Sequence, residues 1–304
     1  MTRFSIVRIA AVPFVAGLLV LASVTSASAT TRSNSNSNNY LALGDSIPFG
    51  FNPFLAQPGV DPNTFVGYPE LASRLFRPMK KLANASCPGE ATSSFIDVNV
   101  PDNGCAPYRA VAALHVSYSG SQLAYAESYV RAHPRTGLIS ITIGANDAGP
   151  LLGYCMANTS NDNDLADCVA KGLNGPYPDA TTGNVLRRMR ANLTTIYSSL
   201  IDAGFHGELV AVTYYSTNYA DAFPTRFLAA VDRVLAAVTE RFGGKVADGF
   251  AAFRAASAPF GGDACAAGLL IPNPPGQGLP PGSCNMHPSR AGAELLAQTL
   301  RAAA

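Results

Sequence analysis

Short strand-like runs alternate with amphipathic helical patterns along most of this chain, and no other feature constrains its fold as strongly. Apolar runs bounded by turn residues predict strands at 40–43, 81–86, 138–143, 208–214 and, more weakly, 245–248. Apolar residues at steps of three and four predict helices over 68–76, 121–132, 184–202, 225–241 and 288–301. Strands that alternate with helices favour a parallel sheet with helices on both faces. We therefore expect one α/β domain over residues 40–304.

Four residues with catalytic potential lie where this topology would bring them together. Ser46 follows the first predicted strand, Gly89 the second, and Asn146 the third. In open parallel sheets, ligands bind beyond the carboxyl ends of the strands. His287 precedes the last predicted helix, and Pro288 would suit that helix's first position. We expect all four residues at one edge of the sheet.

The order of these residues resembles the four sequence blocks of the SGNH hydrolases, also called GDSL esterases and lipases. The blocks correspond to Gly44-Asp45-Ser46, Gly89, Gly144-Ala145-Asn146-Asp147 and His287-Pro288. The G-x-S-x-G pattern of other serine hydrolases does not fit, because Pro48 stands where its last glycine should be. The resemblance covers the whole predicted domain. It implies a three-layer, flavodoxin-like α/β fold around a parallel sheet of five strands.

The resemblance also implies a role for each residue. Ser46 would be the nucleophile and His287 the general base. The backbone N–H groups of Ser46 and Gly89 and the side-chain amide of Asn146 would stabilise an oxyanion. We interpret Asp147 as a turn residue outside the site. The resemblance implies neither a cofactor nor a metal.

One position departs from the family pattern. The family usually carries an acid three residues before the histidine, and this chain has Cys284 there. A group on Nδ1 is still needed to orient the imidazole and select its tautomer. We predict that the Cys284 carbonyl serves, held by a disulfide to Cys265. Asp263 and Asp248 remain alternatives, although each could equally be a solvated loop acid.

The six cysteines are even in number, and six cysteines allow 15 pairings. Sequential pairing would join 87 to 105, 155 to 168 and 265 to 284. Closing loops of that length stabilises a fold by roughly 3 kcal/mol each in the chain-entropy model. The absence of C-x-x-C spacing disfavours zinc.

The N-terminus is typical of a secretory signal peptide over residues 1–29. Two arginines near the start precede an apolar run over 9–24 and the small residues Ala27-Ser28-Ala29. Residues 30–39, TTRSNSNSNN, predict a disordered leader. We therefore expect an extracellular protein. No later segment is apolar over a length that would span a bilayer.

Charge excludes one class of partner. Cleavage after Ala29 would remove two arginines and no acid, leaving 19 basic and 20 acidic residues. A near-neutral protein without a basic run is not expected to bind nucleic acid.

The sequence also lacks the usual patterns of metal sites. His115, His133 and His206 lack partners at metal-ligand spacing, and the acidic stretch 161–167 lacks the glycine and glutamate of a calcium loop. We expect that stretch to be a solvated loop.

The loop after Ser46 is rich in aromatic residues: Phe49, Phe51, Phe54, Phe65 and Tyr68. They could line a groove for an acyl chain or cover the sheet edge as a small core. The predicted function is a secreted esterase or lipase that acts as a monomer on small-molecule or lipid esters. A silent binding protein on the same fold remains open, as does a carbohydrate acetyl esterase, which the absence of Trp makes less favoured.

Overall fold

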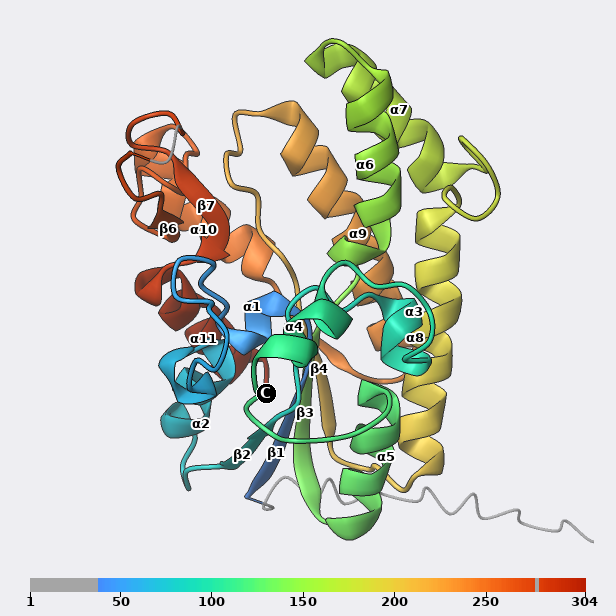
Figure 1. Ribbon diagram of the computed structural model, residues 1–304. Helices are drawn as coiled ribbons and strands as arrows, with labels where there is room; N and C mark the ends of the chain where they lie inside the picture. Colours follow the sequence, from blue (N-terminus) through green and yellow to red (C-terminus); the bar gives the residue numbers. More distant parts are fainter. Residues whose placement is uncertain (1–37, 277–278) are drawn as a thin grey trace, which may run out of the picture. The chain divides into compact units, whose positions relative to one another are not determined.

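The computed structural model describes residues 38–276 and 279–304, all of which belong to one compact unit (Figure 1). The predicted signal peptide at 1–29 and residues 30–37 of the predicted leader lie outside the described residues. The first strand begins at Asn39, so the sheet starts one residue earlier than the pattern predicted.

A parallel sheet of five strands forms the centre of this unit, in the order β2-β1-β3-β4-β5. The central strand β3 is buried at every position, as expected when helices cover both faces. The strands are β1 (Asn39–Gly44), β2 (Lys81–Asn84), β3 (Thr136–Thr142), β4 (Glu208–Val212) and β5 (Lys245–Ala247). This strand order is the flavodoxin-like one, so the predicted fold class is confirmed.

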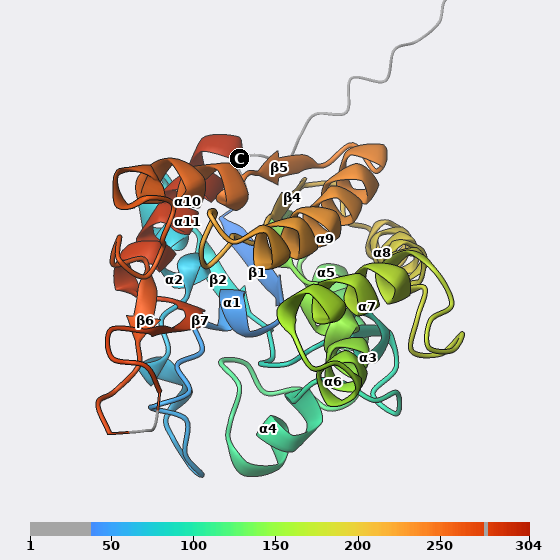
Figure 2. The same cartoon turned by 90° about the horizontal axis from the view of Figure 1, so that it is seen from above.

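Helices cover the sheet on both sides (Figure 2). One layer holds α2 (Tyr68–Leu75), α10 (Gly249–Ser257) and α11 (Arg290–Ala303), with α11 packed on α2, α10, β4 and β5. The other holds α5 (Gln122–Ala132), α8 (Val185–Asp202) and α9 (Ala222–Arg241), with α8 between α5 and α9. No helix in the described part of the chain is long and apolar enough to cross a membrane.

Short helical elements lie between the longer ones along the chain. They are α1 (Ser46–Phe49), α3 (Thr92–Ile96), α4 (Cys105–Val111), and the 3-10 helices η1 (Pro62–Thr64), η2 (Ala145–Ala148) and η3 (Ala258–Phe260).

Two helices stand where the sequence predicted a loop. α6 (Gly149–Asn158) and α7 (Asp162–Asn174) form a helical hairpin. The acidic stretch 161–167 is therefore the first part of α7 and not a solvated loop. Its first asparagine accepts a hydrogen bond from Asp164 N–H at 3.0 Å, and a side-chain cap of this kind favours a helix start.

The chain before the last helix is a strand, which differs from the prediction. β6 (Leu270–Pro272) and β7 (Cys284–Pro288) pair antiparallel, so His287 and Pro288 lie in β7. The helix begins at Arg290, because Ser289 caps it by accepting from Gly292 N–H at 3.2 Å. Pro288 is therefore not the first helical residue.

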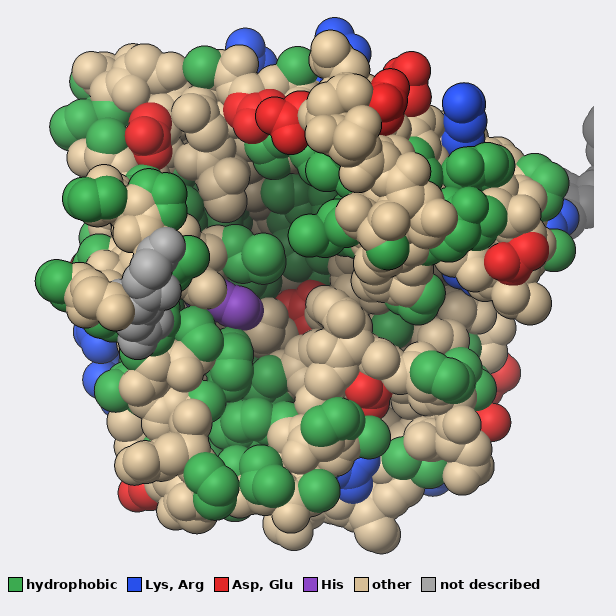
Figure 3. All heavy atoms as spheres, turned by 45° about the horizontal axis from the view of Figure 1, so that its top comes forward, with side chains coloured by type: hydrophobic (Ala, Val, Ile, Leu, Met, Phe, Trp, Pro, Cys, Tyr) green, Lys and Arg blue, Asp and Glu red, His purple; other side chains and the backbone are tan. Residues whose placement is uncertain are grey.

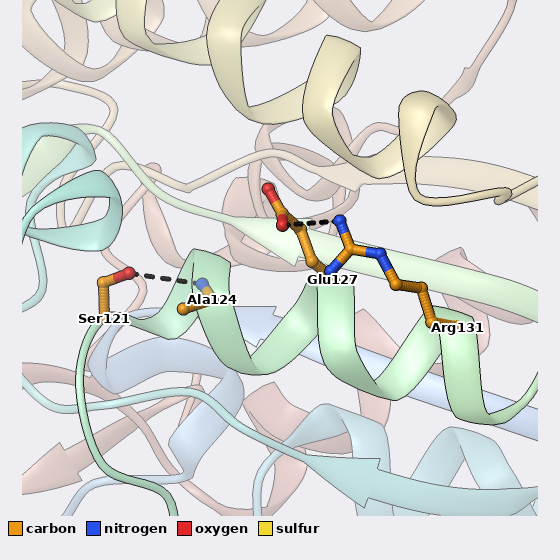
Figure 4. A network of polar contacts seen from close by, with 4 residues as sticks. All are labelled: Ser121, Ala124, Glu127 and Arg131. Atoms are coloured by element: carbon orange, nitrogen blue, oxygen red, sulfur yellow. Dashed lines mark hydrogen bonds and ion pairs between the residues drawn. The ribbon is translucent and has the colours of Figure 1, made fainter.

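A side-chain cap also fixes the start of α5 (Figure 4). Ser121 Oγ accepts from Ala124 N–H at 3.2 Å. Further along, Glu127 and Arg131 pair at 2.9 Å on the outer face, where an exposed ion pair contributes little to stability. The cap matters more, because it places the buried Gln122 in the first turn, close to β1.

All three predicted disulfides are present: Cys87–Cys105, Cys155–Cys168 and Cys265–Cys284. The second joins α6 to α7. The other two lie next to predicted site residues, since Cys87 precedes Gly89 by two positions and Cys284 precedes His287 by three.

Gly44 ends β1 with a backbone that only glycine fits. Its φ is +125°, and a Cβ there would lie 2.0 Å from the Thr142 carbonyl oxygen. We expect Gly44→Ala to lower the free energy of unfolding by about 3 kcal/mol or more, measured by urea denaturation.

Gly120→Ala is the matched control, because its φ is +76° but no atom lies within 4 Å of the added Cβ. It should lose only about 1 kcal/mol. Equal losses in the two variants would show that the close approach of Gly44 to Thr142 does not add to the cost of the substitution.

Candidate active site

Ser46 lies at the start of α1, directly beyond the end of β1. Asp45 caps this short helix, its carboxylate accepting from Ile47 N–H at 3.0 Å. An N–H in the first turn of a helix has no intrahelical acceptor, so Ser46 N–H is available to an oxyanion. The local fold thus presents a hydroxyl and a backbone donor from one residue.

His287 contacts this serine from the far end of the sequence. Its Nε2 is 2.9 Å from Ser46 Oγ, across 241 residues of chain. The ring of Phe51 meets the imidazole edge to face, with 5.2 Å between centroids. The distance suits transfer of the hydroxyl proton to the imidazole.

The group on the other ring nitrogen differs from the predicted one. His287 Nδ1 lies 2.5 Å from Asn285 Oδ1, so a side chain occupies the place predicted for the Cys284 carbonyl. Asp263 is not the partner, because its carboxylate accepts from the N–H groups after it. Asp248 likewise caps α10.

The imidazole is a weak base in this setting. Burial lowers the pKa of His287 to about 4, with no carboxylate to offset the loss of water. The ring is therefore neutral over the physiological pH range, as a general base must be.

Gly89 lies in a turn held against β1. Cys87 N–H donates to the Gly44 carbonyl at 3.0 Å, and Asn103 N–H donates to the Gly89 carbonyl at 3.0 Å. With φ at +84°, a Cβ at Gly89 would lie 2.6 Å from the Asn103 carbonyl oxygen. The Cys87–Cys105 disulfide joins the segment before Gly89 to the start of α4, so the Gly89 turn is fixed from both sides.

Asn146 lies between the Ser46 and Gly89 turns. Its amide nitrogen is 3.0 Å from the Glu90 carbonyl and 3.4 Å from an Asp45 carboxylate oxygen. Asn103 Nδ2 donates to its Oδ1 at 3.0 Å. Because Asn103 donates to the oxygen, the NH₂ group of Asn146 is the end that faces Asp45 and Glu90. These two residues are next to Ser46 and Gly89, the predicted backbone donors.

Buried acids support these turns. Tyr214 O–H donates to Asp45, whose pKa burial raises to about 7. Gln122 donates to Glu90 at 3.1 Å and exchanges hydrogen bonds with both backbone groups of Gly44. Burial also raises the pKa of Glu90 to about 7. Both carboxyl groups bond to groups of the surrounding turns and helices.

Asp147 has a larger role than the turn residue predicted from the sequence. It is buried, and its carboxylate accepts from both the N–H and the hydroxyl of Thr92 at the start of α3. Asn192 on α8 donates to the same hydroxyl at 2.9 Å. This network fixes the turn that carries Asn146.

Sequence reasoning missed Asn285, Asn103, Gln122 and Tyr214. A signal existed only for Asn285, because residues two apart share a face of a strand. It went unused, since no strand was predicted around His287. Nothing local marks the other three, whose contacts span 43, 78 and 169 residues.

The aromatic loop after Ser46 divides between the two predicted roles. Phe49, Phe65 and Tyr68 are fully buried core residues. Phe51 is half-buried beside the imidazole. At this edge the surface is hollowed, and hydrophobic side chains line the hollow around a histidine and an acidic side chain (Figure 3).

The remaining histidines lie outside the site. His115 bonds to the Phe49 carbonyl at 3.0 Å and His133 to the Tyr129 carbonyl at 2.9 Å. Within the described ranges, only Cys87, Glu90 and Cys105 have the spacing of metal ligands. Because the two sulfurs form a disulfide, they are not thiolate ligands.

Solved structures with the same architecture come from ester hydrolases. Phospholipase A1 from Streptomyces albidoflavus NA297 is 19% identical, with a TM-score of 0.54 over 88% of this chain and 100% of that one. The lipase Lip_vut3 from a goat rumen metagenome is 15% identical, with a TM-score of 0.52 over 88% and 97%.

The acetylxylan esterase Axe2 from Geobacillus stearothermophilus is 17% identical, with a TM-score of 0.50 over 86% and 92%. The chain has the SGNH hydrolase fold. No protein-family model matches the sequence, and no curated protein does. Structural similarity therefore supports the fold that the sequence blocks predicted.

The low pKa of His287 predicts how Ser46 reactivity depends on pH. Covalent labelling of Ser46 by a fluorophosphonate should be independent of pH near neutrality. It should fall about tenfold per pH unit below the pKa of about 4, where the imidazole becomes protonated. A fall centred near the ordinary histidine pKa of 6.5 would contradict this, with circular dichroism at each pH controlling for unfolding.

Asn103 should support reactivity without touching the reacting atoms. In Asn103→Ala the Asn146 amide loses the donor to its oxygen and is held only by the contacts of its nitrogen with Glu90 and Asp45. Labelling of Ser46 should therefore slow roughly tenfold, less than the roughly 100-fold cost of deleting an oxyanion donor. Asn99→Ala is the control, since Asn99 lies in the same disulfide-closed loop and its side chain donates to Asp97 at 2.9 Å. Equal rates in the two variants would refute the role of Asn103.

Proposed function

We propose that the protein is a carboxylic-ester hydrolase that forms an acyl-enzyme on Ser46 with His287 as the base. The observation that carries this is the 2.9 Å contact between Ser46 Oγ and His287 Nε2. It joins a hydroxyl at the start of a helix to an imidazole that is neutral near pH 7. The SGNH fold around them supports the same chemistry.

Acylation would begin as Ser46 Oγ attacks the ester carbonyl carbon and its proton passes to Nε2. The carbonyl oxygen then carries the negative charge. The N–H groups of Ser46 and Gly89 and the Asn146 amide are the proposed donors to it. When the tetrahedral intermediate collapses, the Nε2 proton moves to the departing alkoxide and the alcohol leaves.

Deacylation would repeat these steps with water. His287 Nε2 takes a proton from the water as its oxygen attacks the acyl carbon. The same donors hold the second oxyanion, and the proton returns to Ser46 Oγ as the carboxylic acid leaves. The proposed cycle restores the site and needs no cofactor.

The surroundings of the serine favour an apolar acyl group. Phe51 lies beside the imidazole, with 5.2 Å between the two ring centroids. Hydrophobic side chains line the hollow in the surface at this edge (Figure 3). We therefore favour lipid or simple esters. A carbohydrate acetyl ester is the second candidate, supported by the likeness to an acetylxylan esterase.

We further propose that the protein works outside the cytoplasm. Disulfides persist in oxidising compartments, and this chain carries three. The predicted signal peptide points to the same place. Action as a monomer stays a prediction.

Hydrolysis of p-nitrophenyl esters from acetate to palmitate tests the proposal. Ser46→Ala should lose turnover on every ester while thermal unfolding stays nearly unchanged, because the half-buried Ser46 contributes little to packing. Ser93→Ala, at a serine of similar exposure on α3, should keep full turnover.

The preferred chain length would separate a lipase from a short-chain esterase, and acetate release from acetylated xylan would favour the second candidate. Turnover retained in Ser46→Ala would reject Ser46 as the nucleophile. Silence of the wild type on all esters, phospholipids and acetylated xylan would favour a binding protein on the same fold.

A further inference from the structure

We propose that Asn285 is the positioning residue of His287, and that its neutral amide takes the place of the family's acid. The inference deepens the proposed function and rests on it for its catalytic meaning. It concerns a residue that no sequence block of the family marks.

The strand geometry of β7 explains how Asn285 reaches the imidazole. Residues two apart in a strand share a face, so the side chains of Asn285 and His287 point the same way. Asn285 follows Cys284, whose disulfide to Cys265 holds the start of the strand. Tyr215 O–H donates to the Met286 carbonyl at 2.8 Å and holds the residue between them.

A second hydrogen bond decides which end of the amide faces the ring. His287 N–H donates to Asn285 Oδ1 at 3.1 Å, and the same oxygen lies 2.5 Å from Nδ1. Were the amide reversed, its NH₂ group would face the backbone N–H, placing two donors together. The backbone therefore fixes the oxygen as the atom that the imidazole meets.

This orientation selects the tautomer. An amide oxygen only accepts, so Nδ1 must carry the proton. Nε2 then has a free lone pair toward Ser46 Oγ, as a general base requires. The amide performs the orienting role of a carboxylate without adding a negative charge.

Charged groups on the neighbouring elements do not replace the missing acid. β7 packs against β6, α1 and α11. Neither β6 nor α1 contains an ionisable residue other than the serine. On α11, Arg290 and Glu294 pair with each other at 2.6 Å, and Arg301 lies near the other end.

Two further ionisable groups lie close to β7. Asp45 caps α1, but its carboxylate is occupied by Ile47, Asn146 and Tyr214. Tyr215 is an uncharged donor to the strand backbone. Desolvation thus acts on the imidazole without an opposing carboxylate, which agrees with its lowered pKa.

Asn285→Asp tests the electrostatic part of the proposal. The carboxylate keeps both acceptor contacts and adds a charge, so it stabilises the imidazolium and should raise the pKa of His287 by about one to three units. The acid limb of kcat/KM should move to higher pH by the same amount. The plateau rate should be kept, because the tautomer is unchanged.

Asn285→Leu tests the orienting part. It keeps the approximate size and removes the acceptor, so kcat should fall by about 100-fold or more with little change in KM. Asn273→Leu is the control for damage to the hairpin, because Asn273 bonds to Ser283 and lies away from the imidazole. That variant should keep its kcat.

Nitrogen NMR of ring-labelled histidine reads the same quantities without a substrate, with His287→Gln used for assignment. Wild type should give the tautomer protonated at Nδ1, and Asn285→Leu should lose this preference. Should Asn285→Leu fail to fold, the Asn285→Asp titration decides alone. Inactivity of the wild type would reject the proposed function and leave these spectra readable.

An unchanged tautomer and kcat in Asn285→Leu, or an unchanged pKa in Asn285→Asp, would overturn the proposal. Either result would return the role to a backbone carbonyl such as that of Cys284.

Discussion

The parallel pairing of β1 with β3 is the contact on which the site depends. It aligns Gly44 with Thr142, so the segments after the two strands leave the sheet side by side at its carboxyl edge. The glycine allows this close approach. Asp45 and Ser46 follow β1, and the turn to Asn146 follows β3. The positions of Ser46 and Asn146 follow from the register of two strands.

Hydrogen bonds to buried polar groups convert this register into a fixed site. Gln122 bonds to both backbone groups of Gly44, and Asp147 holds the Asn146 turn against α3. Burying a carboxyl or amide group is costly unless its hydrogen bonds are made, so each such group restricts the arrangement of the chain around it. The cost of burial is visible in the raised pKa values of Asp45, Glu90 and Asp147.

His287 lies outside the main sheet and is held by contacts other than those that hold Ser46 and Asn146. It lies in an antiparallel pair outside the main sheet, stabilised by the Cys265–Cys284 disulfide and by Tyr215. Because the acceptor Asn285 lies on the same strand as His287, the imidazole can be oriented without a charged residue from the main sheet or its helices. The proposed base and the proposed oxyanion donors are thus fixed by different parts of the fold.

The sequence by itself determined the architecture and proposed the residues of the candidate site. Hydrophobic periodicity gave all five sheet strands and the longest helices, because burial on one or two faces leaves a regular trace in the chain. The resemblance to the SGNH hydrolases singled out Ser46, Gly89, Asn146 and His287, whose catalytic roles stay predictions. Sequential pairing predicted the three disulfides correctly. The sequence did not predict α6, α7 or the short antiparallel pair of β6 and β7.

Only the tertiary structure decided what surrounds these residues. The partner of His287 is Asn285 and not the Cys284 carbonyl, because β7 is a strand and alternate side chains share its face. Asn103, Gln122 and Tyr214 act across long separations in sequence, and a hydrogen bond between distant residues has no periodicity for a sequence pattern to reveal. The physical reason is that periodicity records burial, whereas orientation depends on which groups the folded chain brings within hydrogen-bonding distance.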